Sequence, residues 1–398
     1  MYIFRHLENK LKELIGRKKS ILLLGPRQTG KSTLLTQIPS DLSISLLQSR
    51  IRLRYEADPQ LLEDEIIALR EKYPSKILPL IVIDEIQKVP ELMDSVQYLI
   101  DHNQAQFILT GSSAKKLRRG HTINLLPGRL QRLRLDPLQL SEMKNIPKLE
   151  DLLSFGSLPR MILLSTEQEK NEELISYVTT YLDEEVREEA IVRKIGVFSR
   201  FLELFGSESG KLVNFSKCAS DIGIGVNTIR SYFEILEDCL VAERVMPYSE
   251  TKALRRLIKT PKYLFFDLGM RRIAAKEGQE LPRNHMGYIF EQFIGLECIR
   301  YLRPFEPLAR FHFWRDSAGH EVDWVVETPE LLIPMEVKWT DKPIKQDAKH
   351  LQLFLNEYEK ASHGFVICKT PRRFKLTDQV TAIPWQECAD WGTLLGKI

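Results

Sequence analysis

The feature that most constrains the fold is a glycine-rich loop between a strand and a helix in residues 20–38, which read SILLLGPRQTGKSTLLTQI. The apolar run ILLL predicts a buried parallel strand, and an amphipathic helix starts directly after the loop. The loop carries the motif Gly25-x-x-x-x-Gly30-Lys31-Ser32. In this strand–loop–helix context, the motif predicts a P-loop that binds a nucleoside triphosphate.

The chemistry of a P-loop gives its residues distinct roles. Glycines let backbone N–H groups curl around phosphates, and the start of the helix adds the positive end of its dipole. We expect the Lys31 ammonium to reach the β- and γ-phosphates of ATP and the Ser32 hydroxyl to ligate Mg²⁺. The predicted nucleotide-binding residues are Gly25, Pro26, Arg27, Gln28, Thr29, Gly30, Lys31, Ser32 and Thr33.

Two further apolar runs end in polar side chains that would complete an ATPase site. The run 80–83 is followed by Asp84 and Glu85, and a later run leads to Ser112. Open α/β sheets hold their ligands at the carboxyl ends of the strands. We therefore expect Asp84 to hold Mg²⁺ through water and Glu85 to be the base that polarises the attacking water. Ser112 is expected to contact the γ-phosphate or that water.

Residues 117–142, which read LRRGHTINLLPGRLQRLRLDPLQLSE, are rich in arginine. An arginine placed against the developing charge on the γ-phosphate accelerates phosphoryl transfer, and a neighbouring subunit often supplies it. Arg129 is our first candidate for this role and Arg119 the second. Either side chain could instead bind nucleic acid or a carboxylate of a neighbouring lid.

Four segments together resemble the AAA+ ATPases of a widespread prokaryotic family, namely GPRQTGKSTLL, IVIDEIQKVP, FILTGSSA and LLPGRLQRLRLDPLQLSE. Proteins of this family carry a C-terminal domain of unknown function, number 4143. The resemblance extends over essentially the whole chain. It implies an ATPase core related to the origin-recognition branch, followed by a small helical lid. Pro127 stands where the resemblance predicts a small residue before the Gly-Arg pair.

The middle of the chain predicts two helical modules. Helical spacing of apolar residues in 143–205 predicts the lid. In 206–277, a short helix, a glycine turn, a second helix and two strands around a basic loop predict a winged helix-turn-helix. The expected DNA-binding residues are Asn227, Thr228, Arg230 and Ser231 on the second helix, and Arg255, Arg256, Lys259 and Lys262 in or beside the wing. Similar modules also bind proteins, so the fold alone does not decide between these partners.

Residues 321–339, which read EVDWVVETPELLIPMEVKW, show two runs of alternating side chains around a Pro-Glu turn. A turn centred there pairs Asp323 with Glu336 and Glu321 with Lys338. Because side chains alternate along strands, these four residues share one face of the predicted hairpin. The apolar residues between them form a core on the other face.

An Asp followed by Glu-x-Lys on the next strand resembles the centre of the PD-(D/E)XK nucleases, across residues 287–375. In those enzymes, two carboxylates bind Mg²⁺ and a lysine orients or deprotonates the attacking water. The resemblance assigns the metal to Asp323 and Glu336 and the water to Lys338, and adds Glu291 from an upstream helix. A hairpin with salt-bridged surface charges has the same pattern, and the fold also binds nucleic acid without cutting it.

Composition limits the class of protein. The length of 398 residues suggests two to four domains, and 43% hydrophobic with 28% charged residues indicates a globular chain. The net charge is only +3, but basic residues gather in 115–134 and 252–272, which implies local anionic partners. The five cysteines have no CxxC spacing, and no apolar run reaches about 18 residues. We therefore expect a cytoplasmic protein that does not enter a membrane.

The predicted fold class is α/β, with four domains in chain order. These are a P-loop AAA+ ATPase core (1–142), a helical lid (143–205), a winged helix-turn-helix (206–277) and a restriction-endonuclease-like α/β domain (278–398). The expected function is ATP-controlled binding and remodelling or processing of DNA, with ATP and Mg²⁺ as cofactors and a homo-oligomer such as a ring. Two alternatives stay open: a nucleotide-driven signalling switch that binds protein partners, and an ATP-regulated defence nuclease.

Overall fold

The computed structural model describes residues 2–73, 78–113, 128–182, 195–249 and 259–396. The chain divides into two compact units, one of Met1–Asp136 with Asp238–Leu240 and one of Pro137–Glu237 with Val241–Ile398. Within the described residues, no helix has both the length and the apolar character of a membrane span.

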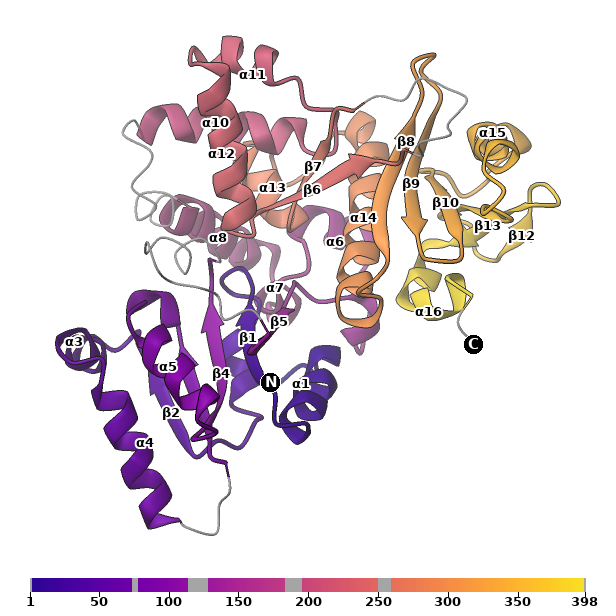
Figure 1. Cartoon of the computed structure of the whole chain (residues 1–398). Coiled ribbons are helices and arrows are strands. Elements are labelled where there is room, and N and C mark those ends of the chain that lie inside the picture. The colour runs from indigo at the N-terminus through magenta and orange to yellow at the C-terminus, as the bar shows by residue number, and fades with distance from the viewer. Residues whose placement is uncertain (1, 74–77, 114–127, 183–194, 250–258, 397–398) are drawn as a thin grey trace. The chain divides into compact units, whose positions relative to one another are not determined.

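The N-terminal unit is built on a parallel sheet in the order β2-β3-β4-β1-β5 (Figure 1). Its strands are β1 (Ser20–Leu24), β2 (Leu42–Ser45), β3 (Leu80–Asp84), β4 (Gln106–Gly111) and β5 (Leu130–Arg134). The apolar runs that predicted buried parallel strands form β1, β3 and β4, whose residues are all buried. This sheet confirms the α/β class.

Helices cover both faces of this sheet. They are α1 (His6–Gly16), α2 (Lys31–Leu35), α3 (Ser49–Ala57), α4 (Leu61–Lys72), α5 (Leu92–Asp101) and the short η1 (Ile86–Lys88). On one face, side chains of α3, α4 and α5 pack on alternate strand residues such as Leu22 and Ile81. On the other face, α1 and α2 pack on Ile21 and Val82. Successive residues of a strand face opposite sides of the sheet, so a continuous apolar run packs against the helices on both sides.

The second unit begins with helices and continues into a second sheet. Its helical elements are η2 (Leu140–Glu142), α6 (Leu149–Phe155), α7 (Pro159–Leu163), α8 (Glu167–Ser176), the π-helical η3 (Tyr177–Leu182), α10 (Ile195–Glu208), α11 (Phe215–Ile222), α12 (Val226–Asp238), α13 (Leu268–Ala274), η4 (Arg283–His285), α14 (Met286–Phe305), η5 (Lys345–Ala348), α15 (Lys349–Glu357), η6 (Trp385–Ala389) and α16 (Trp391–Leu394). Rings of α10, α11 and α12 pack together, as in the contact of Phe201 with Phe233. The predicted glycine turn is present, since Gly223 ends α11 with φ +79°.

Eight strands of the second unit form one sheet in the order β12-β13-β11-β10-β9-β8-β6-β7. They are β6 (Ala242–Pro247), β7 (Lys262–Phe265), β8 (Arg310–Arg315), β9 (Glu321–Glu327), β10 (Leu332–Val337), β11 (Gly364–Cys368), β12 (Phe374–Lys375) and β13 (Val380–Pro384). Strand β6 pairs antiparallel with β7 and parallel with β8. The sheet therefore crosses the boundary that we predicted between residues 277 and 278.

The predicted hairpin is present as β9 and β10, with the expected register. Leu332 pairs with Glu327 and Met335 with Trp324. Beyond these pairs, the backbone N–H of Val337 donates a hydrogen bond of 2.8 Å to the Asp323 carboxylate. Helix α14 lies on one side of these strands and α15 on the other (Figure 1).

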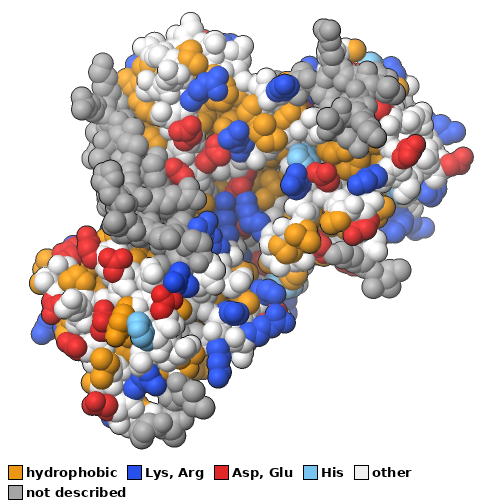
Figure 2. Space-filling model, viewed as in Figure 1, with side chains coloured by type: hydrophobic (Ala, Val, Ile, Leu, Met, Phe, Trp, Pro, Cys, Tyr) orange, Lys and Arg blue, Asp and Glu red, His pale blue; other side chains and the backbone are white. Residues whose placement is uncertain are grey.

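On the face shown in Figure 2, the N-terminal unit carries both acidic and basic side chains. Most of the basic cluster that precedes Arg129 lies outside the described residues, including the second candidate finger, Arg119.

Candidate functional site

The predicted P-loop connects β1 to α2, and two glycines allow its shape. A Cβ atom on Gly25 would lie 2.4 Å from the carbonyl oxygen of Leu135, so a larger residue does not fit there. Gly30 precedes α2 with φ +94°, in the region that favours glycine. The loop thus turns tightly and directs the N-terminus of α2 toward the carboxyl end of the sheet.

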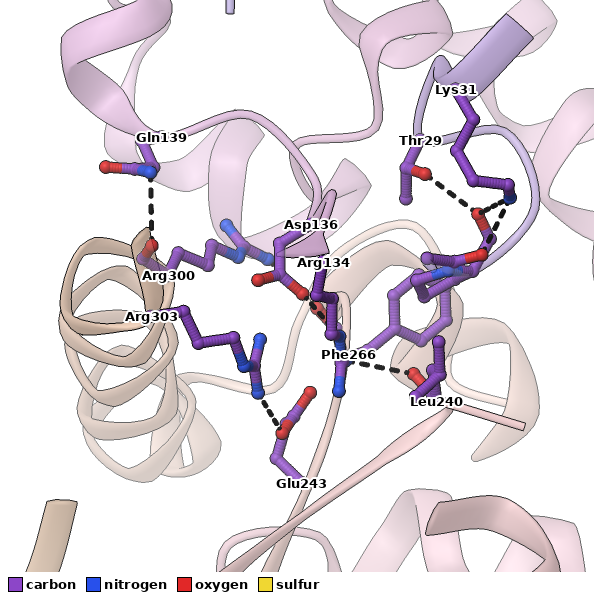
Figure 3. Close-up of polar contacts among 12 residues, drawn as sticks. Thr29, Lys31, Arg134, Asp136, Gln139, Leu240, Glu243, Phe266, Arg300 and Arg303 are labelled. Carbon is purple, nitrogen blue, oxygen red and sulfur yellow. Dashed lines mark hydrogen bonds and ion pairs between the residues drawn. The ribbon is translucent and has the colours of Figure 1, made fainter. Parts of the chain in front are cut away.

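The Lys31 ammonium lies inside this loop (Figure 3). Its Nζ atom donates to the carbonyl oxygens of Gly25 at 2.7 Å and Pro26 at 3.1 Å. The Thr29 hydroxyl donates to the same Pro26 carbonyl at 2.8 Å. The loop is therefore internally hydrogen-bonded, with its one buried cation held against the backbone that is expected to surround the phosphates.

Arg5 supports this loop from outside the motif. Its guanidinium is buried and donates to the carbonyl oxygens of Thr29 at 2.8 Å and Asp136 at 2.7 Å. Sequence reasoning missed this residue, because an arginine just before the first helix carries no motif signal.

Side chains from three elements meet beside the loop. The Ser32 hydroxyl donates to one Asp84 oxygen at 3.1 Å, and the Thr110 hydroxyl donates to the other at 2.5 Å. Strand β4 lies between β1 and β3, so the carboxyl ends of these strands are adjacent. The structure therefore brings together Ser32 and Asp84, the two predicted magnesium-binding residues. Hydroxyl and carboxylate oxygens are ligands that suit Mg²⁺.

Glu85 and Ser112 also lie together, joined by Gln87. The Gln87 amide donates to the Glu85 carboxylate at 2.5 Å and to the Ser112 hydroxyl at 3.1 Å, and all three side chains are buried. Glu85 has φ +62°, a conformation that non-glycine residues seldom adopt and that is often found at functional sites. Sequence reasoning missed Gln87, which has no motif of its own.

Replacing Gln87 with Ala should lower kcat for ATP hydrolysis by about 10- to 100-fold, the range found when outer partners of reacting groups are removed. KM should stay nearly constant, because Gln87 does not touch the loop that binds the phosphates. Steady-state kinetics would measure both values.

A pH profile separates this positioning role from a general effect on folding. Gln87→Glu places a carboxylate beside Glu85, and a neighbouring negative charge raises the pKa of a carboxyl group. The acidic limb of the kcat profile should therefore move to higher pH in Gln87→Glu. An unchanged limb together with normal kcat in Gln87→Ala would refute the role.

The first candidate finger, Arg129, takes part in an ion pair at the surface. Its guanidinium donates to both carboxylate oxygens of Asp101, at 2.5 and 2.9 Å, and both side chains are 36% exposed. Its assignment as a finger for a neighbouring subunit stays a prediction.

A second cluster of charges lies in the sheet of the other unit. The oxygens of Glu291, Glu321 and Asp323 include three that lie within 4.8 Å of one another. Glu336 is 5% exposed, and its Oε1 atom accepts from the Lys338 ammonium at 2.6 Å. The structure thus brings the predicted nuclease-like residues together, although Lys338 pairs with Glu336 rather than with Glu321, its predicted partner.

Burial changes the acidity of this second cluster. It raises the pKa of Glu291, and the neighbouring Asp323 carboxylate raises it further. Burial also raises the pKa of Asp323, and it holds the pKa of Glu336 well above its usual range, with Asp323 as the next cause. Carboxyl groups that are packed this closely favour a bound cation or a bound proton over three free charges.

The residues predicted to contact DNA fall into three groups. Asn227, Thr228, Arg230 and Lys259 are exposed, and Ser231 is partly buried. Arg255 and Arg256 lie outside the described residues. Lys262 was wrongly predicted as a DNA contact, because it is 3% exposed and paired with Glu291 and Glu321. Its neighbours in the sequence suggested a basic wing, whereas β7 turns its side chain inward.

Comparisons with known families divide the chain into three segments. A family model described as an AAA domain matches residues 17–144. A domain of unknown function (DUF8612) matches 146–280, and another (DUF4143) matches 286–388. The N-terminal segment is therefore an AAA domain, of the class that binds and hydrolyses nucleotides. The whole chain combines this AAA domain with the domain of unknown function 4143, as its motifs indicated.

Relatives are found in bacteria and archaea. The chain is 24% identical over 395 residues to the uncharacterized protein Rv2008c of Mycobacterium tuberculosis, covering 97% of this chain and 84% of that protein. It is also 24% identical over 432 residues to the uncharacterized protein MJ1637 of Methanocaldococcus jannaschii, covering 96% and 85%.

Two solved structures show limited overall similarity. CDC6P from Pyrobaculum aerophilum is 11% identical with a TM-score of 0.29, covering 69% of this chain and 94% of that chain. The DNA clamp loader delta protein of Bacillus subtilis is 14% identical with a TM-score of 0.27, covering 57% and 87%.

Proposed function

We propose that this protein hydrolyses ATP and uses the cycle to bind and process DNA. The observation that carries the ATPase assignment is the meeting of Ser32, Asp84, Glu85 and Ser112 beside the P-loop. Mg²⁺, when bound with ATP, neutralises charge on the phosphates. Ser32 and Asp84 would hold this ion, and Lys31 would contact the phosphates.

The proposed chemistry of the chain itself is a proton transfer at Glu85. The Glu85 carboxylate accepts a proton from the attacking water, while Ser112 positions the water or the γ-phosphate. Gln87 holds both groups in place through its amide. Arg129 or Arg119 of a neighbouring copy would stabilise the transferring phosphoryl group, which is the reason to propose a homo-oligomer.

A groove beside the predicted winged helix supports DNA as the partner. It encloses about 780 Å³, and its charged lining residues are three cations, Arg230, Arg244 and Lys259, and one carboxylate, Glu234. Asn214 and Ser216 at the start of α11 also line it. Cations and a helix N-terminus both favour a phosphate group. The Arg230 guanidinium lies 4.4 Å from the centre of the Phe215 ring, which fixes its direction.

The C-terminal centre supports DNA processing as the outcome. Asp323 and Glu336 would hold a divalent ion, and Lys338 would orient the water that attacks a phosphodiester. The buried oxygen Oε2 of Glu336 has no hydrogen-bond partner among the described residues, which fits a carboxylate that ligates an ion.

ATP turnover with a DNA panel tests this proposal. Single-stranded, duplex, forked and four-way-junction DNA should be compared at two salt concentrations, and one structure should stimulate turnover. Binding to phosphates weakens steeply as salt rises, so the stimulation should fall at the higher salt. In the same reactions, any Mg²⁺-dependent cutting should be lost in Lys338→Ala. Turnover that no DNA changes would overturn the DNA assignment and favour a switch that binds proteins.

A further inference from the structure

The acidic cluster of the second unit contains a lysine from outside the segment that supplies its carboxylates. Lys262 lies on β7, within the segment matched by the DUF8612 model, whereas Glu291 and Glu321 lie in the segment matched by DUF4143. Its ammonium contacts Glu291 at 3.0 Å and Glu321 at 2.6 Å. The rings of Phe313 and Trp324 lie about 5 Å from the same Nζ atom, at 5.0 and 5.1 Å. The ammonium is therefore enclosed and is not a surface charge.

Three carboxylates lie near enough to share a cation, and Lys262 forms ion pairs with two of them, Glu291 and Glu321. One carboxylate oxygen from each of Glu291, Glu321 and Asp323 lies within 4.8 Å of the other two. The second Glu321 oxygen accepts from Arg315 at 2.9 Å. A metal ion on Glu291 and Glu321 would have to lie close to the ammonium, and the two positive charges would repel each other.

Asp323 and Glu336 have carboxylate oxygens that do not pair with Lys262 and could ligate a metal ion. Asp323 accepts from the Val337 backbone through Oδ2, and Glu336 pairs with Lys338 through Oε1. The Glu336 Oε2 atom is buried and has no hydrogen-bond partner among the described residues. A buried carboxyl oxygen without a hydrogen-bond partner is unfavourable, so this atom is available as a ligand for a cation.

We propose that the Lys262 ammonium fills the second cation position of this centre, so that the centre binds one divalent ion, between Asp323 and Glu336. This inference rests on the proposed nuclease-like function. In two-metal centres the ions lie about 3.5–4 Å apart on shared carboxylates. Here Asp323 is the carboxylate that both positions would share, and Lys262 neutralises the other side of it.

The test is the number of Mn²⁺ ions bound per chain, measured by titration calorimetry and by electron paramagnetic resonance of free Mn²⁺. Full-length protein without nucleotide is used, and all samples carry Asp84→Asn so that the ATPase site does not contribute. The protein with Lys262 intact should bind one Mn²⁺, and Lys262→Met should bind a second. Lys338→Met is the matched control, since it removes the other ammonium of the centre and should not add an ion.

The outcomes separate the inference from the function on which it rests. No Mn²⁺ bound with Lys262 intact would refute the metal centre itself. One Mn²⁺ in both that protein and a folded Lys262→Met would leave the metal centre standing and overturn the role of Lys262. A second ion in Lys338→Met as well would also overturn it, because any lost ammonium would then have the same effect.

A second pair of variants tests the same assignment if Lys262→Met does not fold. Glu336→Gln should weaken binding of the single Mn²⁺ by at least about tenfold, because it removes a ligand. Glu291→Gln should change that affinity by less than about tenfold, because Lys262 already neutralises Glu291. Equal losses in both variants would show that the ion uses the Glu291 side, which the inference excludes.

Discussion

Replacing Glu85 with Gln should leave ATP binding intact and slow hydrolysis by about 10²–10⁴-fold, the range that a general base supplies. The amide has nearly the same shape as the carboxylate but cannot accept the proton of the attacking water. ATP binding depends on the P-loop backbone and on Lys31 rather than on the Glu85 carboxylate. Binding would be measured with a fluorescent ATP analogue, and hydrolysis by phosphate release.

The matched control is Glu91→Gln, which makes the same chemical change on an exposed side chain nearby. It should leave both binding and turnover unchanged. Turnover in Glu85→Gln that equals the wild-type rate would refute the base assignment, and loss of ATP binding would show that Glu85 instead supports the nucleotide pocket.

Replacing Arg300 with Met should destabilise the second unit by about 3–5 kcal/mol, the cost of removing one partner from a buried ion pair. The Arg300 guanidinium donates to Glu297 at 3.0 Å, to the Ser157 hydroxyl at 2.8 Å and to the Phe266 carbonyl at 2.9 Å. Arg300 is 4% exposed and Glu297 is 1% exposed. Without the guanidinium, the Glu297 charge stays buried and loses its cation.

Urea unfolding followed by tryptophan fluorescence would measure this loss, since all five tryptophans lie at or after Trp314 and so report on the second unit. Arg303→Met, one turn further along α14, is the matched control. Arg303 is 27% exposed and pairs with Glu243, whose side chain is 11% exposed, so its removal should cost less than the removal of Arg300, which is buried together with Glu297. Equal losses of stability in the two variants would refute the idea that the buried ion pair of Arg300, part of which appears in Figure 3, contributes more than its partly exposed neighbour.

The parts of the two sites that depend on short-range pattern could be predicted from sequence. The P-loop residues are consecutive, and apolar runs placed Asp84 and Ser112 at the ends of neighbouring parallel strands. The register of β9 and β10 followed from side-chain alternation around a short turn, because a shift by one residue would exchange the apolar and charged faces. These rules need no knowledge of distant segments.

The parts that depend on distant packing could not be predicted. Lys262 lies among basic residues in the sequence and looked like a surface cation, but β7 joins the sheet beside β6 and turns this side chain toward Glu291. Gln87 contacts Ser112 as well as nearby Glu85, Arg5 contacts Thr29 and Asp136, and neither residue belongs to a recognisable motif. Arg129 was predicted as the arginine finger from its position in the sequence. That position does not indicate that its side chain pairs with Asp101.

The position of β6 between β7 and β8 has a consequence for how this chain can be divided. A fragment that started after residue 280 would leave β8 as an edge strand, with unpaired N–H and C=O groups that invite pairing with other chains. It would also lack Lys262, and Glu291 and Glu321 would lose that cation. The segments matched by DUF8612 and DUF4143 therefore share one sheet, and a cut between them would expose the edge of β8.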